Sequence, residues 1–340
     1  MNNKEIKLSV SLVTYNAEKY LRDCLLSLSE QSFKDWQILI IDNGSSDNTI
    51  RFIKENYPQF KIVEHKDNIG FAQAHNQAIA WTKSEYIMCL NQDIVLDKDY
   101  FKETIKFLDK NKKVGSVTGK LYKWDIQNNV KTKTIDSTGL LIHGNYRVTD
   151  RGEGKEDVGE YNTNEEVFGV SGAAPVYRRS ALDKVKIHNT SHRDEYFDED
   201  FFAYKEDVDL AFRLRLAGYS SYFVASAIAW HDRSTANSHL ETNWKIASAH
   251  RKKNKLVNYL SYRNHLLMLY KNAFRKNMLI RFFPLTWYEL RKYVFMIFFN
   301  NIHNRETKTF GQLKKVMKNK RKQIKELTKI DSQAMLKWIK

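Results

Sequence analysis

Residues 8–50 read LSVSLVTYNAEKYLRDCLLSLSEQSFKDWQILIIDNGSSDNTI, and this stretch decides the fold class of the chain. Two apolar, β-branched runs, Leu8–Val13 and Gln37–Ile41, read as strands, and Ala17–Ser29 between them has helical periodicity. A second helical pattern, Asp47–Asn56, follows the second strand. Strands that alternate with helices in this way predict an α/β fold with a mostly parallel sheet flanked by helices.

The same alternation continues to about residue 120. The further predicted elements are strands at Lys61–Val63, Tyr86–Leu90 and Val114–Val117, and helices at Phe71–Thr82 and Asp99–Lys110. Ligands of such sheets bind at the carboxyl ends of the strands. We therefore expect three polar strand tails to converge on one edge: Thr14-Tyr15-Asn16, Asp42-Asn43-Gly44-Ser45-Ser46 and Asn91-Gln92-Asp93.

The pattern changes twice further along the chain. Glycines punctuate short alternating runs in Leu121–Tyr177, which predicts β-hairpins and a mobile acidic loop. A helix over Lys205–Ala217, stopped by Gly218, and a strand over Ser221–Ala225 follow. Beyond Glu241 the sequence is helical, basic and aromatic. We predict a catalytic domain over residues 1–240 and a helical basic C-terminal extension over 241–340.

The positive charge is concentrated in that extension. Residues 241–340 hold 24 Lys and Arg against 5 Asp and Glu, whereas the first 240 residues hold 32 basic and 35 acidic ones. Such asymmetry suggests an anionic partner, either membrane lipid or nucleic acid. The extension has no recognisable nucleic-acid module, so we predict no nucleic-acid partner.

The stretch 277–300, NMLIRFFPLTWYELRKYVFMIFFN, is the candidate membrane contact. Its charged residues interrupt it too often for a span, which needs about 20 predominantly apolar residues. Its mixture of aromatic and basic residues is typical of a helix that lies in a membrane interface. The alternative is an amphipathic helix that only packs on the catalytic domain. With two unpaired cysteines, Cys24 and Cys89, and no signal-peptide pattern, we expect a cytoplasmic protein, peripheral on the inner face of the cell membrane.

Several strand tails carry residue types suited to a nucleotide. Asp42 at a sheet edge can accept the N3 hydrogen of a uracil or thymine ring, although Asp42–Asp47 alone is as well explained by a turn and a helix cap. Asn68 and Gly70 repeat the arrangement, and the next helix carries His75 and Asn76. The N-terminus of that helix would suit a diphosphate.

The third tail, Asn91-Gln92-Asp93, interrupts an apolar run and is either a turn or a cation site. Mg²⁺ or Mn²⁺ on a nucleotide diphosphate needs only one or two protein carboxylates. Asp93 suffices as a metal ligand, and Asn91 can assist it.

The longest chemical signal is Phe197–Arg213, whose acidic residues are too many for an ordinary buried segment. Glu206 and Asp207 fall at a helix start, where the helix dipole favours an ionised carboxylate, a candidate general base. They can also be plain helix-start charges. His231, in AWHDRS, is either a structural histidine or a ligand of the metal or diphosphate.

In order and spacing, these segments resemble the family 2 glycosyltransferases. The matching stretches are SLVTYNAEKYLRDCLLSL, IIDNGSSDNT, NIGFAQAHNQAI, LNQDIVL, SGAAPVYRRSAL, FDEDFFAYKEDVDLAFRLRLAGY and AWHDRS. The resemblance implies a GT-A (Rossmann-like) fold, a nucleotide-sugar donor, a divalent cation, Mg²⁺ or Mn²⁺, and inversion at the anomeric carbon. It makes Asp207 the base, places Glu206 against a sugar, and assigns the metal to Asp93 and His231. The predicted nucleotide-sugar-binding residues are Thr14, Tyr15, Asn16, Asp42, Asn43, Asn68, Gly70, Asn76, Asn91 and Gln92.

One departure guides the choice of donor. The family motif commonly begins with Asp where this chain has Asn91, and Asn is familiar there in rhamnosyltransferase-like members. We therefore predict transfer of L-rhamnose from dTDP-L-rhamnose to a lipid-linked or polysaccharide acceptor in cell-surface glycan synthesis. The alternatives are a UDP-hexose donor (galactose or glucose), an inactive relative that only binds sugar nucleotide, and a nucleic-acid-binding protein that uses the basic tail.

Overall fold

The computed structural model describes residues 6–189, 191–233, 244–300 and 304–340. The strands are β1 Leu8–Thr14, β2 Trp36–Asp42, β3 Lys61–Glu64, β4 Tyr86–Asn91, β5 Ile94–Leu96, β6 Val114–Asp125, β7 Val130–Ser137, β8 Leu140–Ile142, β9 Val148–Asp150, β10 Glu165–Val167, β11 Val176–Arg178, β12 Ile187–His188, β13 Asp194–Glu195 and β14 Ser220–His231. The helices are α1 Glu18–Ser29, α2 Thr49–Asn56, α3 Phe71–Trp81, α4 Tyr100–Lys110, α5 Arg179–Val185, the 3₁₀ helix η1 Glu199–Phe201, α6 Glu206–Leu216, α7 Trp244–Asn272, α8 Arg275–Ile280, α9 Phe282–Asn300, α10 Asn304–Leu327 and α11 Ser332–Leu336.

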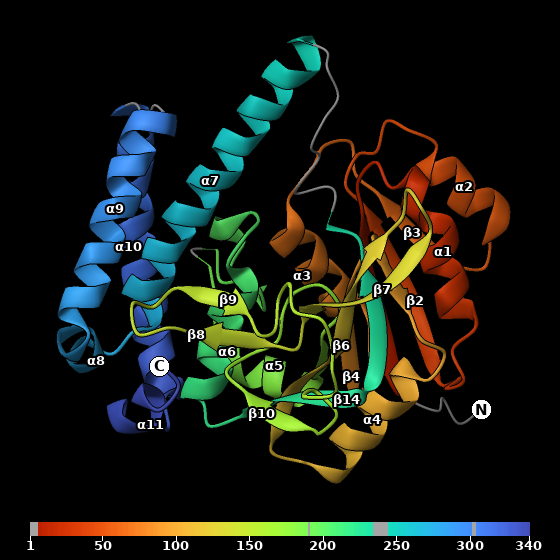
Figure 1. Cartoon of the computed structure of the whole chain (residues 1–340), viewed down its shortest axis with the longest axis horizontal. Coiled ribbons are helices and arrows are strands. Elements are labelled where there is room, and N and C mark those ends of the chain that lie inside the picture. The colour runs from red at the N-terminus through yellow and green to blue at the C-terminus, as the bar shows by residue number, and fades with distance from the viewer. Residues whose placement is uncertain (1–5, 190, 234–243, 301–303) are drawn as a thin grey trace.

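One large, mostly parallel sheet forms the centre of the molecule (Figure 1). Its strand order is β10-β14-β6-β11-β4-β1-β2-β3, with β5 beside β14 and β7 beside β6. The pairs β3-β2-β1-β4 and β6-β14 are parallel, whereas β11 runs antiparallel to both β4 and β6. The α/β fold with a mostly parallel sheet is therefore confirmed.

Helices cover both faces of the sheet because successive strand residues point to opposite faces. Val10, Ile40 and Met88 pack with α1, α2 and α4 in one hydrophobic cluster. Leu39, Ile41 and their neighbours on the opposite face pack against α3, α5 and α6. Burial on both faces explains why the strands read as nearly continuous apolar runs.

Parallel register brings the three strand tails together, as predicted. Thr14 at the end of β1 lies opposite Asp42 at the end of β2, and Val13 lies opposite Asn91 at the end of β4. The polar residues that follow each strand therefore meet at one edge of the sheet.

Two strands are longer than the sequence patterns indicated. β6 continues through Gly119, where a Cβ atom would lie 2.2 Å from the carbonyl oxygen of Ala227, so this close strand approach requires glycine. β14 continues past an irregularity between Phe223 and Ile228 and ends at His231. A bulge interrupts side-chain alternation, which hides the length of such a strand from the pattern.

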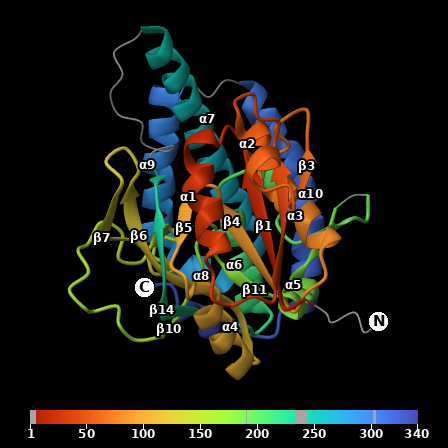
Figure 2. The ribbon, with the colours of Figure 1, turned by 90° about the vertical axis from the view of Figure 1, so that its right-hand side faces the viewer.

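The C-terminal helices pack on the side of the molecule that carries α6 (Figures 1 and 2). Phe212 of α6, Met268 of α7, Met317 of α10 and Ile142 of β8 share one hydrophobic cluster. The domain boundary predicted near residue 240 lies outside the described residues. No helix in the described parts of the chain has the length and apolar character that crossing a membrane requires.

A buried ionic cluster joins those helices to the acidic segment. Lys271 of α7 pairs with Asp198 and lies 2.8 Å from Asp209, and Lys320 of α10 lies 2.6 Å from Asp198 and 2.7 Å from Glu195. Asp198 and Asp209 are fully buried. The segment is therefore acidic and buried at once, because lysines from distant helices compensate its charge.

Candidate functional site

Asp42 organises the loop that follows β2. Its Oδ1 accepts hydrogen bonds from the hydroxyls of Thr14 (2.9 Å) and Ser45 (2.5 Å). Its Oδ2 accepts from the backbone N–H groups of Gly44 (3.1 Å) and Ser45 (2.8 Å). Thr14 and Asp42 are both fully buried, so they shape the loop at this edge of the sheet.

Asn16 and Gln92 link the neighbouring strand tails. Asn16 has a positive φ of 49°, donates its backbone N–H to Ser45 and accepts from the backbone N–H of Ser46 at 2.9 Å. The Gln92 side chain accepts from the N–H of Tyr15 at 2.7 Å and donates to its carbonyl at 3.2 Å. The Tyr15 side chain is about half exposed, at 47%. This edge thus offers Tyr15 and Asn16 to a ligand.

The start of α3 depends on Gly70. Asn68 accepts a hydrogen bond from the N–H of Gly70 at 2.9 Å, and Gly70 has φ 88°. A Cβ atom there would lie 2.6 Å from the Phe202 ring, so glycine lets the Phe202 loop approach the helix N-terminus.

Asn43 and Asn76 are buried, unlike Tyr15 and Asn16. Asn76 accepts from the N–H groups of Tyr196 and Phe197 and donates to the carbonyl of Phe197 (2.8 Å) and to Glu199. The amide of Asn76 thus has partners within the fold, and its predicted contact with the donor stays a prediction. Asn43 is also buried, with its Nδ2 donating to the carbonyl of Gly70 at 3.4 Å.

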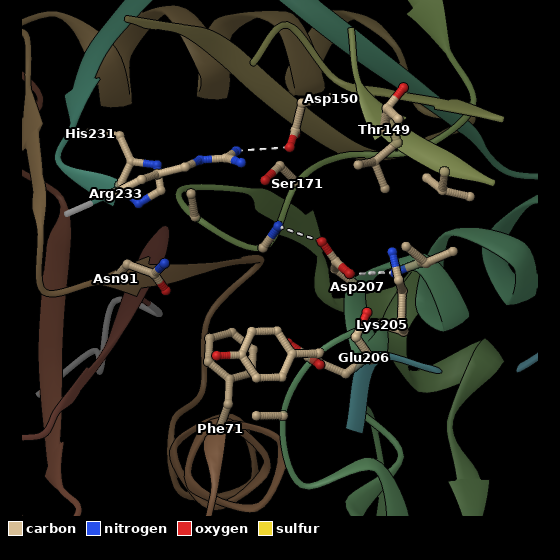
Figure 3. A pocket seen from close by; sticks show the side chains of 18 residues that line it. Phe71, Asn91, Thr149, Asp150, Ser171, Lys205, Glu206, Asp207, His231 and Arg233 are labelled. Carbon is tan, nitrogen blue, oxygen red and sulfur yellow. Dashed lines mark hydrogen bonds and ion pairs between the residues drawn. The ribbon is translucent and has the colours of Figure 1, made fainter. Parts of the chain in front are cut away.

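A cavity of about 450 Å³ lies at the carboxyl end of the sheet, within the range of about 300–1,000 Å³ common for small-molecule sites. Asn91, His231 and Arg233 lie on one side of it, and Glu206 and Asp207 on the other (Figure 3). Four predicted residues from three separate segments of the chain, Asn91, Glu206 with Asp207, and His231, thus line one cavity.

Asp207 is held on the cavity wall at the start of α6. Its Oδ2 accepts the backbone N–H of Gly172 at 3.0 Å, and its Oδ1 accepts that of Val208 at 2.7 Å. Burial raises the pKa of Asp207 above its usual 3.8, and Lys205 partly opposes this. Burial and the adjacent Asp207 raise the pKa of Glu206 to about 8. The pair combines fixed position with an increased affinity for protons, as a general base requires.

His231 lies between two carboxylates. Its Nδ1 is 2.9 Å from Asp136, and its Nε2 is 3.4 Å from Asp93. Burial alone would lower its pKa, but Asp93 and Asp136 raise it to about 10. Arg233, two residues after His231, lies 2.7 Å from Asp136 and 2.8 Å from Asp150.

Asp136 holds one ring nitrogen of His231 and the other faces Asp93, an arrangement that can orient a histidine toward a cation between His231 and Asp93. Among the residues that the structure describes, no group of three or more His, Cys, Asp or Glu could hold a metal ion. Asp93 is 5% exposed and is not among the residues that line the cavity, whereas His231 is. The described residues therefore supply one or two ligands, which is what a cation carried by a diphosphate needs.

Four residues of the site were missed from the sequence: Asp136, Asp150, Lys205 and Arg233. Lys205 lies directly beside the predicted Glu206, and Arg233 lies two residues after the predicted His231. Asp136 and Asp150 come from the hairpin region, where no spacing pointed to them. Only the pairing of β6 with β7 and of β8 with β9 brings them to His231 and Arg233.

Comparison with known proteins gives one family. Residues 9–186, more than half of the chain, match the family described as Glycosyl transferase family 2. Poly-beta-1,6-N-acetyl-D-glucosamine synthase of Staphylococcus epidermidis is 30% identical over 230 residues, which are 66% of this chain and 49% of that protein. The chain thus spans about half the length of the curated relatives it matches.

Two solved structures show the same fold. S. aureus TarS 1-349 in complex with UDP-GlcNAc has a TM-score of 0.51 at 15% identity, covering 95% of this chain and 84% of that one. GalNAc-T7 with UDP, GalNAc and Mn²⁺ has a TM-score of 0.54 at 12% identity, covering 68% and 44%. Both are glycosyltransferase structures with a mostly parallel central sheet, as predicted for this chain.

Proposed function

Because this chain belongs to glycosyl transferase family 2, we propose that it transfers a sugar from a nucleotide donor to an acceptor hydroxyl in cell-surface glycan synthesis, with inversion at the anomeric carbon. The observation that carries the proposal is the position of Asp207. Its carboxylate is fixed on the cavity wall by Gly172, across from the strand edge at Asn91.

In the proposed reaction the acceptor hydroxyl oxygen attacks the anomeric carbon. The bond from that carbon to the diphosphate oxygen breaks, and the hydroxyl proton passes to Asp207. Glu206 lies beside Asp207 on the same wall and contacts a sugar. A divalent cation on the diphosphate would, when bound, neutralise charge on the leaving group, and Asp93 and His231 would hold it with help from Asn91.

Relatives shape the choice of donor. The similar proteins include a poly-beta-1,6-N-acetyl-D-glucosamine synthase and a TarS structure in complex with UDP-GlcNAc. They make UDP-GlcNAc the first donor to test and do not support the dTDP-L-rhamnose that Asn91 led us to predict. UDP-galactose and UDP-glucose complete the panel, scored by release of nucleoside diphosphate with Mg²⁺ or Mn²⁺ and again with EDTA. Loss of turnover with EDTA is expected, and full activity would contradict the need for a cation.

The experiment that tests the base is Asp207→Asn. We expect transfer to fall by about 10²- to 10⁴-fold, while donor binding measured by calorimetry changes little. Asp125→Asn removes an exposed carboxylate that does not line the cavity and serves as the control. A variant at Asp207 that kept most of its activity would remove this residue from the role of base.

The apolar outer face of α8 and α9 supports attachment to an anionic membrane surface. Leu279, Phe283 and Trp287 are exposed by 72%, 83% and 64%. Arg275, Lys276 and Arg291 are exposed on the same helices. Basic residues near anionic lipid add about 1 kcal/mol each, and exposed aromatic side chains insert at the interface.

A further inference from the structure

A second, smaller cavity adjoins the first. It encloses about 230 Å³ and shares Val148, Thr149, Asp150 and Lys205 with the larger cavity. Its other walls are the loop at Arg147, Glu153, His265 of α7, and Tyr288 and Lys292 of α9. The smaller cavity therefore extends from the candidate active site to the inner side of α9, the helix whose outer face is apolar and exposed.

The cations of this cavity lack partners, whereas its carboxylates have them. Within the described residues, Arg147, Lys205 and Lys292 make no ion pair, although Lys292 lies over the Tyr288 ring at 5.1 Å. Asp150 and Glu153 both face Arg233, at 2.8 Å and 3.5 Å. The neighbouring Glu289 accepts from His265 at 2.8 Å. The unpaired charge in this cavity is thus positive.

The three cations also act on one another. Burial lowers the pKa of Lys205, and Lys292 lowers it further against the opposing effect of Asp207. Burial likewise lowers the pKa of Lys292, with a further contribution from Arg147 against that of Glu289. Holding these like charges around one cavity costs free energy that an anion placed between them would recover.

We propose that this cationic cavity, Arg147, Lys205 and Lys292, binds a phosphate group of the acceptor. The inference rests on the proposed function and names the chemical class of acceptor for the same site. A phosphate monoester carries about −1.5 to −2 charges at pH 7, which matches several cations better than a single carboxylate does. The planar guanidinium of Arg147 can bind two phosphate oxygens at once. Lys205 joins both cavities, so a phosphate here leaves the acceptor hydroxyl within the cavity of Asp207.

The test measures binding of sn-glycerol 3-phosphate to the full chain by calorimetry. No nucleotide sugar is present. We expect the double variant Arg147→Gln, Lys292→Gln to weaken binding by about tenfold or more. The matched control Arg275→Gln, Lys276→Gln removes the same charge from the exposed side of α8 and should change binding by no more than about twofold. Arg147→Gln alone, at an exposed position, keeps the test usable if the double variant is poorly folded.

Several results would overturn the inference. These are unchanged binding in the double variant, equal binding of uncharged glycerol, or an equal loss in the control. Vesicles of phosphatidylcholine and phosphatidylglycerol separate a lipid headgroup from a soluble phosphate. If the double variant loses vesicle binding but keeps glycerol 3-phosphate binding, the cations contact the bilayer surface and the inference is wrong. Because the probe needs no sugar transfer, a protein that binds it without transferring sugar contradicts only the proposed function.

Discussion

At the scale of single residues, the site places two acidic side chains next to each other in a buried position. Glu206 is 7% exposed, and its Oε2 has no hydrogen-bond partner within the described structure. A buried, unpaired carboxylate is costly when ionised. The acidic pair therefore lowers the stability of the fold at a position suited to proton transfer.

That cost predicts a pH dependence. The pKa of Glu206 is about 8 in the folded protein and near 4.5 when unfolded, so between these values only the folded protein keeps the proton. Its contribution to stability is greatest below about pH 4.5 and is lost as pH rises toward 8. Glu206→Gln should raise Tm by about 2 °C or more at pH 8 and much less at pH 5, measured by calorimetry. Glu326→Gln, an exposed change, is the control. An equal gain at both pH values would contradict this explanation.

At the scale of elements, α7 and α10 hold the acidic segment in place. Lys320 of α10 faces Glu195, Asp198 and Asp200 at 2.6–2.8 Å, and its own side chain is 1% exposed. Asp198 begins η1, and the chain then runs directly to Glu206 and Asp207. The C-terminal helices therefore act on the site through this segment, and α7 also lines the larger cavity at Ser261.

Removing one of these lysines should be severe. Lys320→Met leaves Glu195 and Asp200 without this cation and Asp198 with Lys271 alone, and we expect a loss of about 3–5 kcal/mol in the free energy of unfolding. Lys322→Met, exposed on the same helix, should change it by no more than about 0.5 kcal/mol. Urea unfolding followed by circular dichroism measures both. A loss below about 1 kcal/mol at Lys320 would show that the cluster contributes little.

At the scale of the whole molecule, the C-terminal helices are both part of the core and a candidate membrane surface. Met317 of α10 and Met335 of α11 are buried with Phe212 of α6. Truncation of these helices would expose that cluster, so a deletion cannot test membrane binding cleanly. Substitutions on the exposed face of α9 can.

We expect the double variant Phe283→Ser, Trp287→Ser to reduce binding to phosphatidylglycerol-containing vesicles by at least about tenfold. The reason is that two aromatic side chains are then missing from the set that inserts into the membrane interface. The matched control is Trp81→Ser, on α3, since Trp81 is exposed to nearly the same extent as Trp287, 61% against 64%. Sedimentation with vesicles measures binding. A similar loss with the control, or none with the double variant, would refute attachment through α9.

The sequence by itself determined the fold class, the convergence of the strand tails and the position of Glu206 and Asp207 at a helix start. These follow from local periodicity and from parallel pairing, which places every strand end at the same edge. Asn76 and His231 show the limit of such reasoning. Their partners within the fold, Tyr196 and Phe197 for Asn76 and Asp93 and Asp136 for His231, depend on packing, and no local pattern indicated them.

Only the tertiary structure decided which charges meet. Asp136 pairs with His231, 95 positions away, and Lys320 pairs with Asp198, 122 positions away. Burial then decided which carboxylates are compensated, as at Asp198, and which are left with a raised pKa, as at Glu206. The energy of a charge depends on its depth and its neighbours rather than on its place in the sequence, which is why the cationic cavity at Arg147 and Lys292 became visible only in the folded chain.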